Sequence, residues 1–311
     1  MPVETFHTLI AKNKRNSILL IGVFMLLFVG LGLLIGYVWG HDWYFSVAVA
    51  AVAAGIAFFM TLTSYFGGSS ALLAMSGARR ITKEDDPQLY NVVEEMAIAA
   101  GIPVPKIYII DDSAMNAFAT GRNPKHASVA ITRGLREKLT RDELQGVMAH
   151  ELSHIRHYDI LYATLMAVMV GVLVLMCDVF LRSLWFGAGR SRSRSRSRKG
   201  GGGAQAILLI VALVLAIVAP ILARIIHMAL SRQREYLADA GSVELTRNPE
   251  GLAAALAKLS GDTEVLEVAN RATAPLYIVH PIKNFEDRSR NFMQTHPPIG
   301  DRIKRIMSLT V

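Results

Sequence analysis

Long runs without a charged side chain dominate the hydropathy pattern of this chain. Two of them, residues 18–39 and 43–73, are joined at the short turn "GHDW", whose Trp43 begins the second run. A helix needs about 20 consecutive apolar residues to cross the hydrocarbon core of a membrane, whereas a helix of a soluble protein is apolar mainly on one face. The pattern therefore predicts a transmembrane hairpin over residues 18–75, which follows a basic N-terminal leader, residues 1–17.

Basic residues flank this predicted hairpin at both ends. Lys12, Lys14 and Arg15 precede it and Arg79 and Arg80 follow it, while its turn contains neither Lys nor Arg. Because Lys and Arg accumulate on the cytoplasmic side of membrane helices, both ends of the hairpin are expected to face the cytoplasm.

A second pair of apolar runs, residues 160–181 and 206–223, predicts another membrane hairpin over residues 160–228, although Asp178 interrupts its first run. The sequence "RSRSRSRSRKGGGG" lies between the two runs, in a basic loop, residues 187–203, that is expected to be disordered. If both helices cross the membrane, this loop lies outside the cytoplasm, against the charge rule. The alternative is a shallow hairpin that keeps the loop beside anionic lipid on the cytoplasmic side, and both arrangements remain open.

The remaining segments, residues 76–159 and 229–311, have the pattern of a soluble domain in two halves. "DPQLYNVVEEMAIAAG" has a helical period, and "TRDELQGVMAHELSHIRH" begins with a capping box of Thr140 and Glu143. "KIYIIDD" and "HASVAIT" predict short strands, the segment between them carries turn signals, and "NPEGLAAALAKLSG" and "GDRIKRIMSL" predict further helices. The sequence thus predicts a mainly α membrane protein with four membrane helices and an α+β domain that contains a small sheet.

Net charge and cysteine content narrow the classes of function. The formal net charge of the 311 residues is +8, and six of the positive charges lie in residues 190–199, which leaves +2 for the rest of the chain. A charge confined to one loop, without interleaved aromatic residues, is not the pattern of a nucleic-acid-binding protein, so no nucleic-acid partner is expected. The single cysteine, Cys177, cannot form an internal disulfide.

The stretch "VMAHELSHIRHYDI" carries the candidate chemistry. His150 and His154 are four residues apart and share one face of the predicted helix, at a spacing suited to two ligands of a zinc ion. Glu151 lies beside them, where a carboxylate can take the proton of a zinc-bound water as it attacks a peptide carbonyl. The alternative interpretation of the short motif H-E-x-x-H is a polar helix face that binds no metal.

A catalytic zinc usually has a third protein ligand and one open position. The downstream candidates are Glu235, Asp239, His280 and His296, and spacing alone does not choose between them. If the second hairpin returns the chain to the same side of the membrane, its following helix can bring Glu235 to the two histidines.

Four longer segments, taken in their order along the chain, indicate a family. They are "DDSAMNAFATGRNPKHASVAITRGL", "HELSHIRHYD", "SRQREYLADAGSVELT" and "THPPIGDRIKRI". Together with the two N-terminal spans, they make the chain resemble the HtpX family of bacterial membrane zinc metalloproteases, which are related to the CAAX prenyl endopeptidases. The resemblance implies a zincin-like catalytic domain and one Zn²⁺ per chain.

The resemblance also implies a role for each matching residue. His150, His154 and Glu235 would be the zinc ligands, and Glu151 the general base. The residues with supporting roles would be Asp159 and Asp239, which orient ligands; Asn116 and Ala117, in an edge strand to which substrate adds; His296, near the oxyanion; and Arg232, which pairs with nearby carboxylates.

The activity implied is that of a membrane-embedded endopeptidase that cuts misfolded or damaged membrane proteins as part of stress response and quality control. Its partners would be membrane-protein substrates and the lipid bilayer, and the sequence predicts no oligomeric state. Its place would be the bacterial inner membrane, as a multi-pass protein whose catalytic domain faces the cytoplasm. One alternative is a membrane scaffold or chaperone with a structural zinc, and another is a non-enzymatic adaptor that acts through the basic loop.

Overall fold

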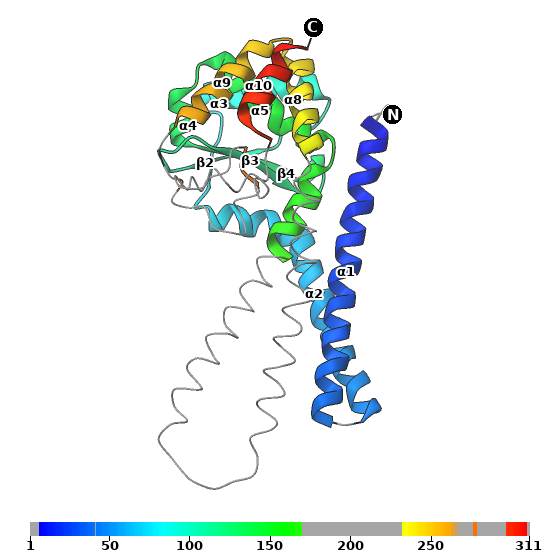
Figure 1. The fold of residues 1–311 in the computed structure, drawn as a ribbon. Coiled ribbons are helices and arrows are strands. Elements are labelled where there is room, and N and C mark those ends of the chain that lie inside the picture. The colour runs from blue at the N-terminus through cyan, green and yellow to red at the C-terminus, as the bar shows by residue number, and fades with distance from the viewer. Residues whose placement is uncertain are drawn as a thin grey trace, which may run out of the picture.

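The computed structural model describes residues 6–40, 42–169, 232–262, 264, 266, 276–278 and 297–309. Most of the predicted second hairpin, the basic loop and His296 lie outside the described residues. Figure 1 shows a helical hairpin that projects from a domain in which helices cover a small sheet.

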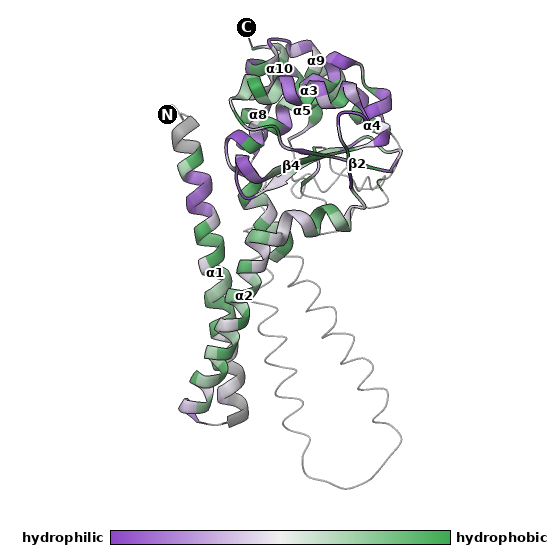
Figure 2. Ribbon diagram, turned by 180° about the vertical axis from the view of Figure 1, so that it is seen from behind, coloured by the Kyte–Doolittle hydropathy of each residue, from purple (hydrophilic) through white to green (hydrophobic). Residues whose placement is uncertain are grey.

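Two long helices, α1 (Phe6–Gly40) and α2 (Trp43–Met75), form the hairpin. The carboxylate of Asp42 caps α2 by accepting the N–H of Phe45 at 3.2 Å. The segments Ile10–Gly30 and Trp43–Met75 are long and apolar enough to cross a membrane. Large apolar side chains project from both helices, with Leu26 73% exposed and Phe59 65% exposed, and the hydrophobic colour covers most of the hairpin (Figure 2). Such surfaces are stable in hydrocarbon and unfavourable in water.

Two glycines of α1 allow the close contact between the hairpin helices. A Cβ added at Gly32 would lie 2.6 Å from the Cα of Ala50, and one at Gly36 would lie 2.5 Å from the Cα of Ser46. No side chain fits at those distances. Because lipid removes the hydrophobic force between helices, close backbone approach at small residues is an important source of their association.

The sheet has the strand order β1-β2-β4-β3, with β1 (Arg79–Arg80), β2 (Lys106–Ile110), β3 (Ala117–Gly121) and β4 (Ala127–Thr132). β2 and β4 are parallel, and β3 pairs antiparallel to β4 at one edge of the sheet. The predicted strands correspond to β2 and β4, whereas β3 lies in the segment that carried turn signals. All five residues of β3 are buried, so its sequence lacks the alternation that marks a strand with one solvated face.

The helices of the domain gather on one face of the sheet (Figure 1). They are α3 (Pro87–Ala100), α4 (Arg133–Lys138), α5 (Arg141–Arg156), α8 (Arg232–Thr246), α9 (Pro249–Gly261) and α10 (Ile299–Met307), with a short 3₁₀ helix η1 (Pro124–His126) before β4. The main core between helices and sheet includes Leu89, Val129, Leu144, Met148 and Leu256.

The central helix α5 begins with the predicted capping box. The hydroxyl of Thr140 accepts the N–H of Glu143, and the carboxylate of Glu143 accepts the N–H of Thr140 at 2.7 Å. Just after α5, Tyr158 adopts a positive φ of 63°, a left-handed conformation that is strained for a bulky residue. This turn redirects the chain into the helix Asp159–Met169, whose apolar side chains pack with those of α1 and α2.

Candidate active site

Two helices bring three potential metal ligands together. His150 and His154 lie one turn apart on α5, with their Nε2 atoms 3.2 Å from each other. Glu235 lies in the first turn of α8, and its carboxylate oxygens are 3.8 Å from His150 Nε2 and 3.7 Å from His154 Nε2. All three ligand atoms lie within 4.8 Å of one another.

Close packing of α8 on α5 fixes the position of Glu235. A Cβ added at Gly241 would collide with the side chain of Ser153, so glycine is required where the two helices meet. The hydroxyl of Ser242 donates a hydrogen bond to the carbonyl of Gly146 at 2.7 Å. These two contacts set the height of α8 along α5 and thereby place Glu235 opposite the histidines.

The outer nitrogens of the two histidines face carboxylates. His150 Nδ1 lies 3.0 Å from Asp239 Oδ1, and His154 Nδ1 makes a 3.0 Å hydrogen bond with Asp159 Oδ2. A carboxylate at Nδ1 favours the tautomer that carries the proton there and leaves the lone pair on Nε2. Once Nε2 of both rings is deprotonated, both lone pairs face the Glu235 carboxylate, and this set of two imidazoles and one carboxylate fits a divalent ion such as zinc with one open position.

Arg302 on α10 holds Asp239 from the other side. Its guanidinium donates to both carboxylate oxygens, at 2.9 and 2.7 Å, and also to the carbonyl of Ile278 at 3.3 Å. It lies 3.6 Å from Glu235 as well, and its side chain is fully buried. Arg302 was not among the predicted site residues. The available signal was its place on the apolar stripe of α10 with Ile299 and Ile306, where a charged side chain implies a buried partner.

Asn13 on α1 holds Asp159. Its amide donates to Asp159 Oδ1 at 2.5 Å and to the carbonyl of His157 at 3.0 Å, and it is 4% exposed. A residue of the membrane hairpin therefore orients the carboxylate that orients His154. This contact was also missed, because the short basic leader gave no sign of a partner in the domain.

Glu151 is 2% exposed and lies between the histidines and the edge strand β3. Burial raises its pKa from 4.5 to about 7, against the opposing effects of nearby cations and of a hydrogen bond from the backbone of Ala119. A carboxyl with a pKa near neutrality can both accept and return a proton at physiological pH.

The histidines differ in their own proton affinity. Burial lowers the pKa of His150. Burial also opposes the charged form of His154, but the carboxylates of Asp159 and Glu235 outweigh it and raise its pKa to about 9. A bound cation competes with that proton, so metal binding at this site is expected to release protons.

The remaining predicted site residues are placed differently. Asn116 is buried directly before β3 and accepts the N–H of Ala117 at 3.1 Å through its side chain. Ala117 begins β3, at the edge of the sheet, and its carbonyl accepts the N–H of Ile278 at 3.0 Å. Arg232 is exposed at the start of α8, and within the described residues Arg302 is the arginine that pairs with the site carboxylates.

Comparison with known proteins agrees with this geometry. The model of peptidase family M48 matches residues 83–310. A "Protease HtpX homolog" of Dictyoglomus thermophilum is 46% identical over 303 residues, which cover 97% of this chain and 94% of the relative. The homolog of Thermoanaerobacter pseudethanolicus is 44% identical over 314 residues and is covered over 100% of both chains.

Among solved structures, Ste24p of S. mikatae has a TM-score of 0.47 and 19% sequence identity, over 96% of this chain. The match spans 66% of the Ste24p chain. The expected resemblance to the HtpX family is confirmed by the sequence relatives: this chain belongs to peptidase family M48 and is a membrane-bound metalloprotease similar to HtpX.

Proposed function

We propose that this metalloprotease uses zinc to hydrolyse peptide bonds of misfolded or damaged membrane proteins at the cytoplasmic face of the bacterial inner membrane. The observation that carries the proposal is the cluster of His150, His154 and Glu235 with the buried carboxyl of Glu151 beside it. A structural zinc site does not require a buried carboxyl beside the metal ligands, whereas a carboxyl with a pKa of about 7 suits a catalytic proton transfer.

His150, His154 and Glu235 would hold the ion, in the ligand set of a catalytic zinc with an open position. When bound, zinc supplies Lewis-acid polarisation of the scissile carbonyl and of the attacking water. Asp159 and Asp239 hold the histidine rings in the orientation that metal binding requires.

Glu151 is the proton carrier in this proposal. Its carboxylate takes a proton from the attacking water and returns it to the nitrogen of the leaving peptide. The edge strand β3 presents its backbone beside Glu151 at Ala119, so an extended substrate can add to the sheet there, after Asn116 and Ala117; the carbonyl of Ala117 itself already accepts from Ile278. Oxyanion stabilisation by His296 and charge pairing by Arg232 stay predictions.

The choice of membrane substrates rests on the short chain distance between the site and the apolar segments. The helix Asp159–Met169, which packs against the hairpin, starts five residues after His154. The basic residues at both ends of the hairpin support a cytoplasmic catalytic domain. A cleft held near the bilayer surface meets protein segments that leave the membrane more often than it meets dilute soluble chains.

The test is to purify the full chain and its Glu151→Gln and His150→Ala variants in detergent. Cleavage of an unfolded membrane protein and metal content by elemental analysis are measured for each. Glu151→Gln is expected to lower cleavage about 100-fold or more while the chain keeps stoichiometric zinc. His150→Ala is expected to lose both metal and activity. Unchanged cleavage in Glu151→Gln, or active material without stoichiometric zinc, would contradict the proposal.

A further inference from the structure

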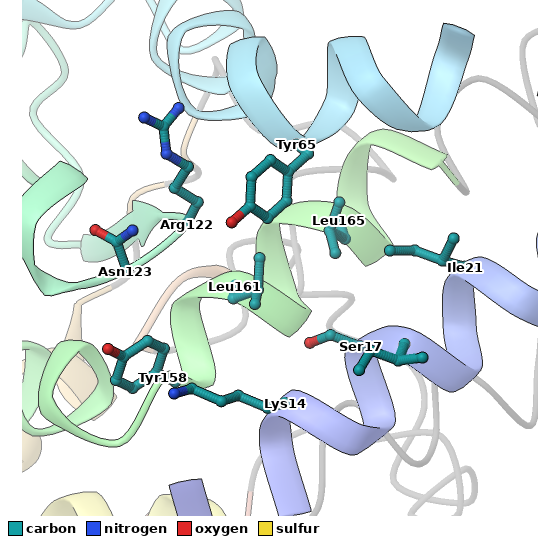
Figure 3. A pocket seen from close by; sticks show the side chains of 10 residues that line it. Lys14, Ser17, Ile21, Tyr65, Arg122, Asn123, Tyr158, Leu161 and Leu165 are labelled. Carbon is teal, nitrogen blue, oxygen red and sulfur yellow. The ribbon is translucent and has the colours of Figure 1, made fainter. Parts of the chain in front are cut away.

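A pocket of about 420 Å³ lies where the membrane hairpin meets the domain, apart from the metal site. Figure 3 shows that four segments line it: α1, α2, the turn after β3, and the start of the helix Asp159–Met169. Its volume is in the range of small-molecule sites.

One wall of the pocket is cationic. Lys14 Nζ lies 4.3 Å from the ring centroid of Tyr158, and Arg122 Cζ lies 4.9 Å from that of Phe66. Within the described part of the chain, neither cation makes an ion pair with a carboxylate, and none of the lining residues is acidic. Asn123 uses its carbonyl oxygen to accept from His126, which leaves its amide N–H groups to donate. Two cations and an amide donor are the groups that bind a phosphate.

The other wall is apolar. Ile21 of α1 faces Leu161 and Leu165 of the helix after α5 across the pocket (Figure 3), and Ile18 also lines the pocket. Ile18 is the first residue of the long uncharged run of α1 and is 69% exposed. Along α1 a hydrophilic band near the N-terminal end is followed by a long hydrophobic stretch (Figure 2). The pocket therefore has its charges at the membrane boundary and its apolar wall toward the hydrocarbon.

We propose that this pocket binds one anionic phospholipid molecule of the surrounding membrane. The phosphate lies between Lys14, Arg122 and Asn123, and the first part of an acyl chain follows the wall formed by Ile18, Ile21, Leu161 and Leu165. A phospholipid presents a negative group and an apolar chain in this order and at this depth of the bilayer. Lysine and arginine at the membrane surface favour anionic over zwitterionic lipid.

The bound lipid would also lie against the chain neighbours of the supports of the metal site. Lys14 follows Asn13, and Tyr158 precedes Asp159, so two lining residues are chain neighbours of the pair that holds His154. Arg122 directly follows β3, which ends at Gly121. A lipid between these segments holds α1, Asp159 and the edge strand in one arrangement, so peptidase activity is expected to rise with anionic lipid.

The test compares two variants that remove the same charge. Lys14→Gln/Arg122→Gln removes both pocket cations. Arg15→Gln/Lys125→Gln removes one exposed cation from α1 and one from η1, beside the same two segments but outside the lining. The delipidated full-length chain is titrated with phosphatidylglycerol or phosphatidylcholine of identical acyl chains, and bound lipid is counted by native mass spectrometry.

Wild type and the control variant are expected to bind one phosphatidylglycerol at least five times more tightly than phosphatidylcholine. The pocket variant is expected to lose that preference, and Lys14→Arg/Arg122→Lys to retain it. Leu161→Trp, which fills the apolar wall and keeps both cations, is expected to weaken binding of both lipids. Thermal unfolding of every variant verifies that the chain is folded.

Equal binding by the pocket and control variants would overturn the proposal, because it would show general attraction to a basic surface. Displacement of the lipid by millimolar glycerol phosphate would also overturn it, because the site would then recognise a free phosphate. Binding requires neither zinc nor proteolysis, so this result is independent of the proposed enzymatic function.

Discussion

His150 and His154 lie on one helix, yet different regions of the molecule hold them. The outer nitrogen of His150 faces Asp239 and, through it, Arg302 of the C-terminal helix α10. The outer nitrogen of His154 binds Asp159 and, through it, Asn13 of the membrane helix α1. His150 is therefore supported from inside the soluble domain, and His154 is supported from the interface between the domain and the hairpin.

The two supports also differ in kind. Asp239 and Arg302 form an ion pair whose side chains are 3% and 0% exposed, so neither charge has water as an alternative partner. Asn13 and Asp159 share one charge between them, in a contact that is 4% and 9% exposed. The support of His150 is therefore tied to the stability of the domain, whereas the support of His154 can respond to the position of α1.

The largest expected effect follows from Asp239→Asn. Among the ion pairs of the described residues, the substitution leaves the buried guanidinium of Arg302 with Glu235 at 3.6 Å, so we expect a loss of about 3 kcal/mol in unfolding free energy and loss of activity. Thermal unfolding of the detergent-solubilised chain measures the first effect. The control is Glu244→Gln on the same helix, whose ion pair with Arg156 is partly exposed and is expected to contribute under about 1 kcal/mol.

The next effect concerns Glu151, which lies on the same helix between His150 and His154 in sequence. Its folded-state pKa is about 7, above the ordinary value of 4.5, so the folded chain binds this proton more tightly than the unfolded chain. Its contribution to stability is fully present below pH 4.5 and is lost as the pH rises through about 7. Glutamine stays neutral, so in the metal-free chain Glu151→Gln is expected to be stabilising at pH 8, by an amount on the order of 3 kcal/mol, since each pKa unit is worth about 1.4 kcal/mol.

Denaturant unfolding of the chelated wild type and Glu151→Gln at pH 5 and pH 8 provides the measurement. The stability difference is expected to be small at pH 5 and large at pH 8. A difference that is the same at both values would show that the carboxyl is not held in its neutral form.

Asp159→Asn tests the support of His154. Removing the charge while keeping the shape weakens the hold on His154 Nδ1, and loss of such an outer contact typically costs 10- to 100-fold in metal affinity. In the metal-free chain the raised pKa of His154 makes this side chain a cation as well, but it keeps Glu235 at 3.7 Å and is 16% exposed, so the free energy of unfolding is expected to fall less than in Asp239→Asn. Competition with a zinc chelator gives the affinity, and an equal loss of stability in the two variants would remove the distinction between the supports.

The features that the sequence predicted correctly are those marked by residues close together in the chain. The capping box of Thr140 and Glu143 and the helical period of α5 are written within a few residues, and both are confirmed. β3 was missed because all its residues are buried and no alternation marks it. The resemblance to the HtpX family implied an edge strand at Asn116 and Ala117, which the residue pattern did not indicate.

The supports of the histidines could not be predicted for a different reason. Asn13 and Asp159 are 146 residues apart, and Arg302 and Asp239 are 63 apart, so each pair exists only after the whole chain has folded. A polar residue on an apolar helix stripe, as at Arg302, indicates that some partner exists and leaves its identity open.

The smallest effect is expected from Asn13→Ala, and it tests the comparison most directly. Of the two hydrogen bonds that Asn13 loses, the one to the Asp159 carboxylate acts on His154, and its loss should cost about 1 kcal/mol, or several-fold, in zinc affinity. The control is Asn16→Ala, one turn along the same helix and partly exposed. Because Asn13 acts through Asp159, the double variant with Asp159→Asn should be no worse than Asp159→Asn alone, whereas the double variant with Asp239→Asn should show additive losses of affinity. Additivity in both cycles would mean that Asn13 contributes only to the packing of α1, and that the membrane helix and the metal site are not coupled.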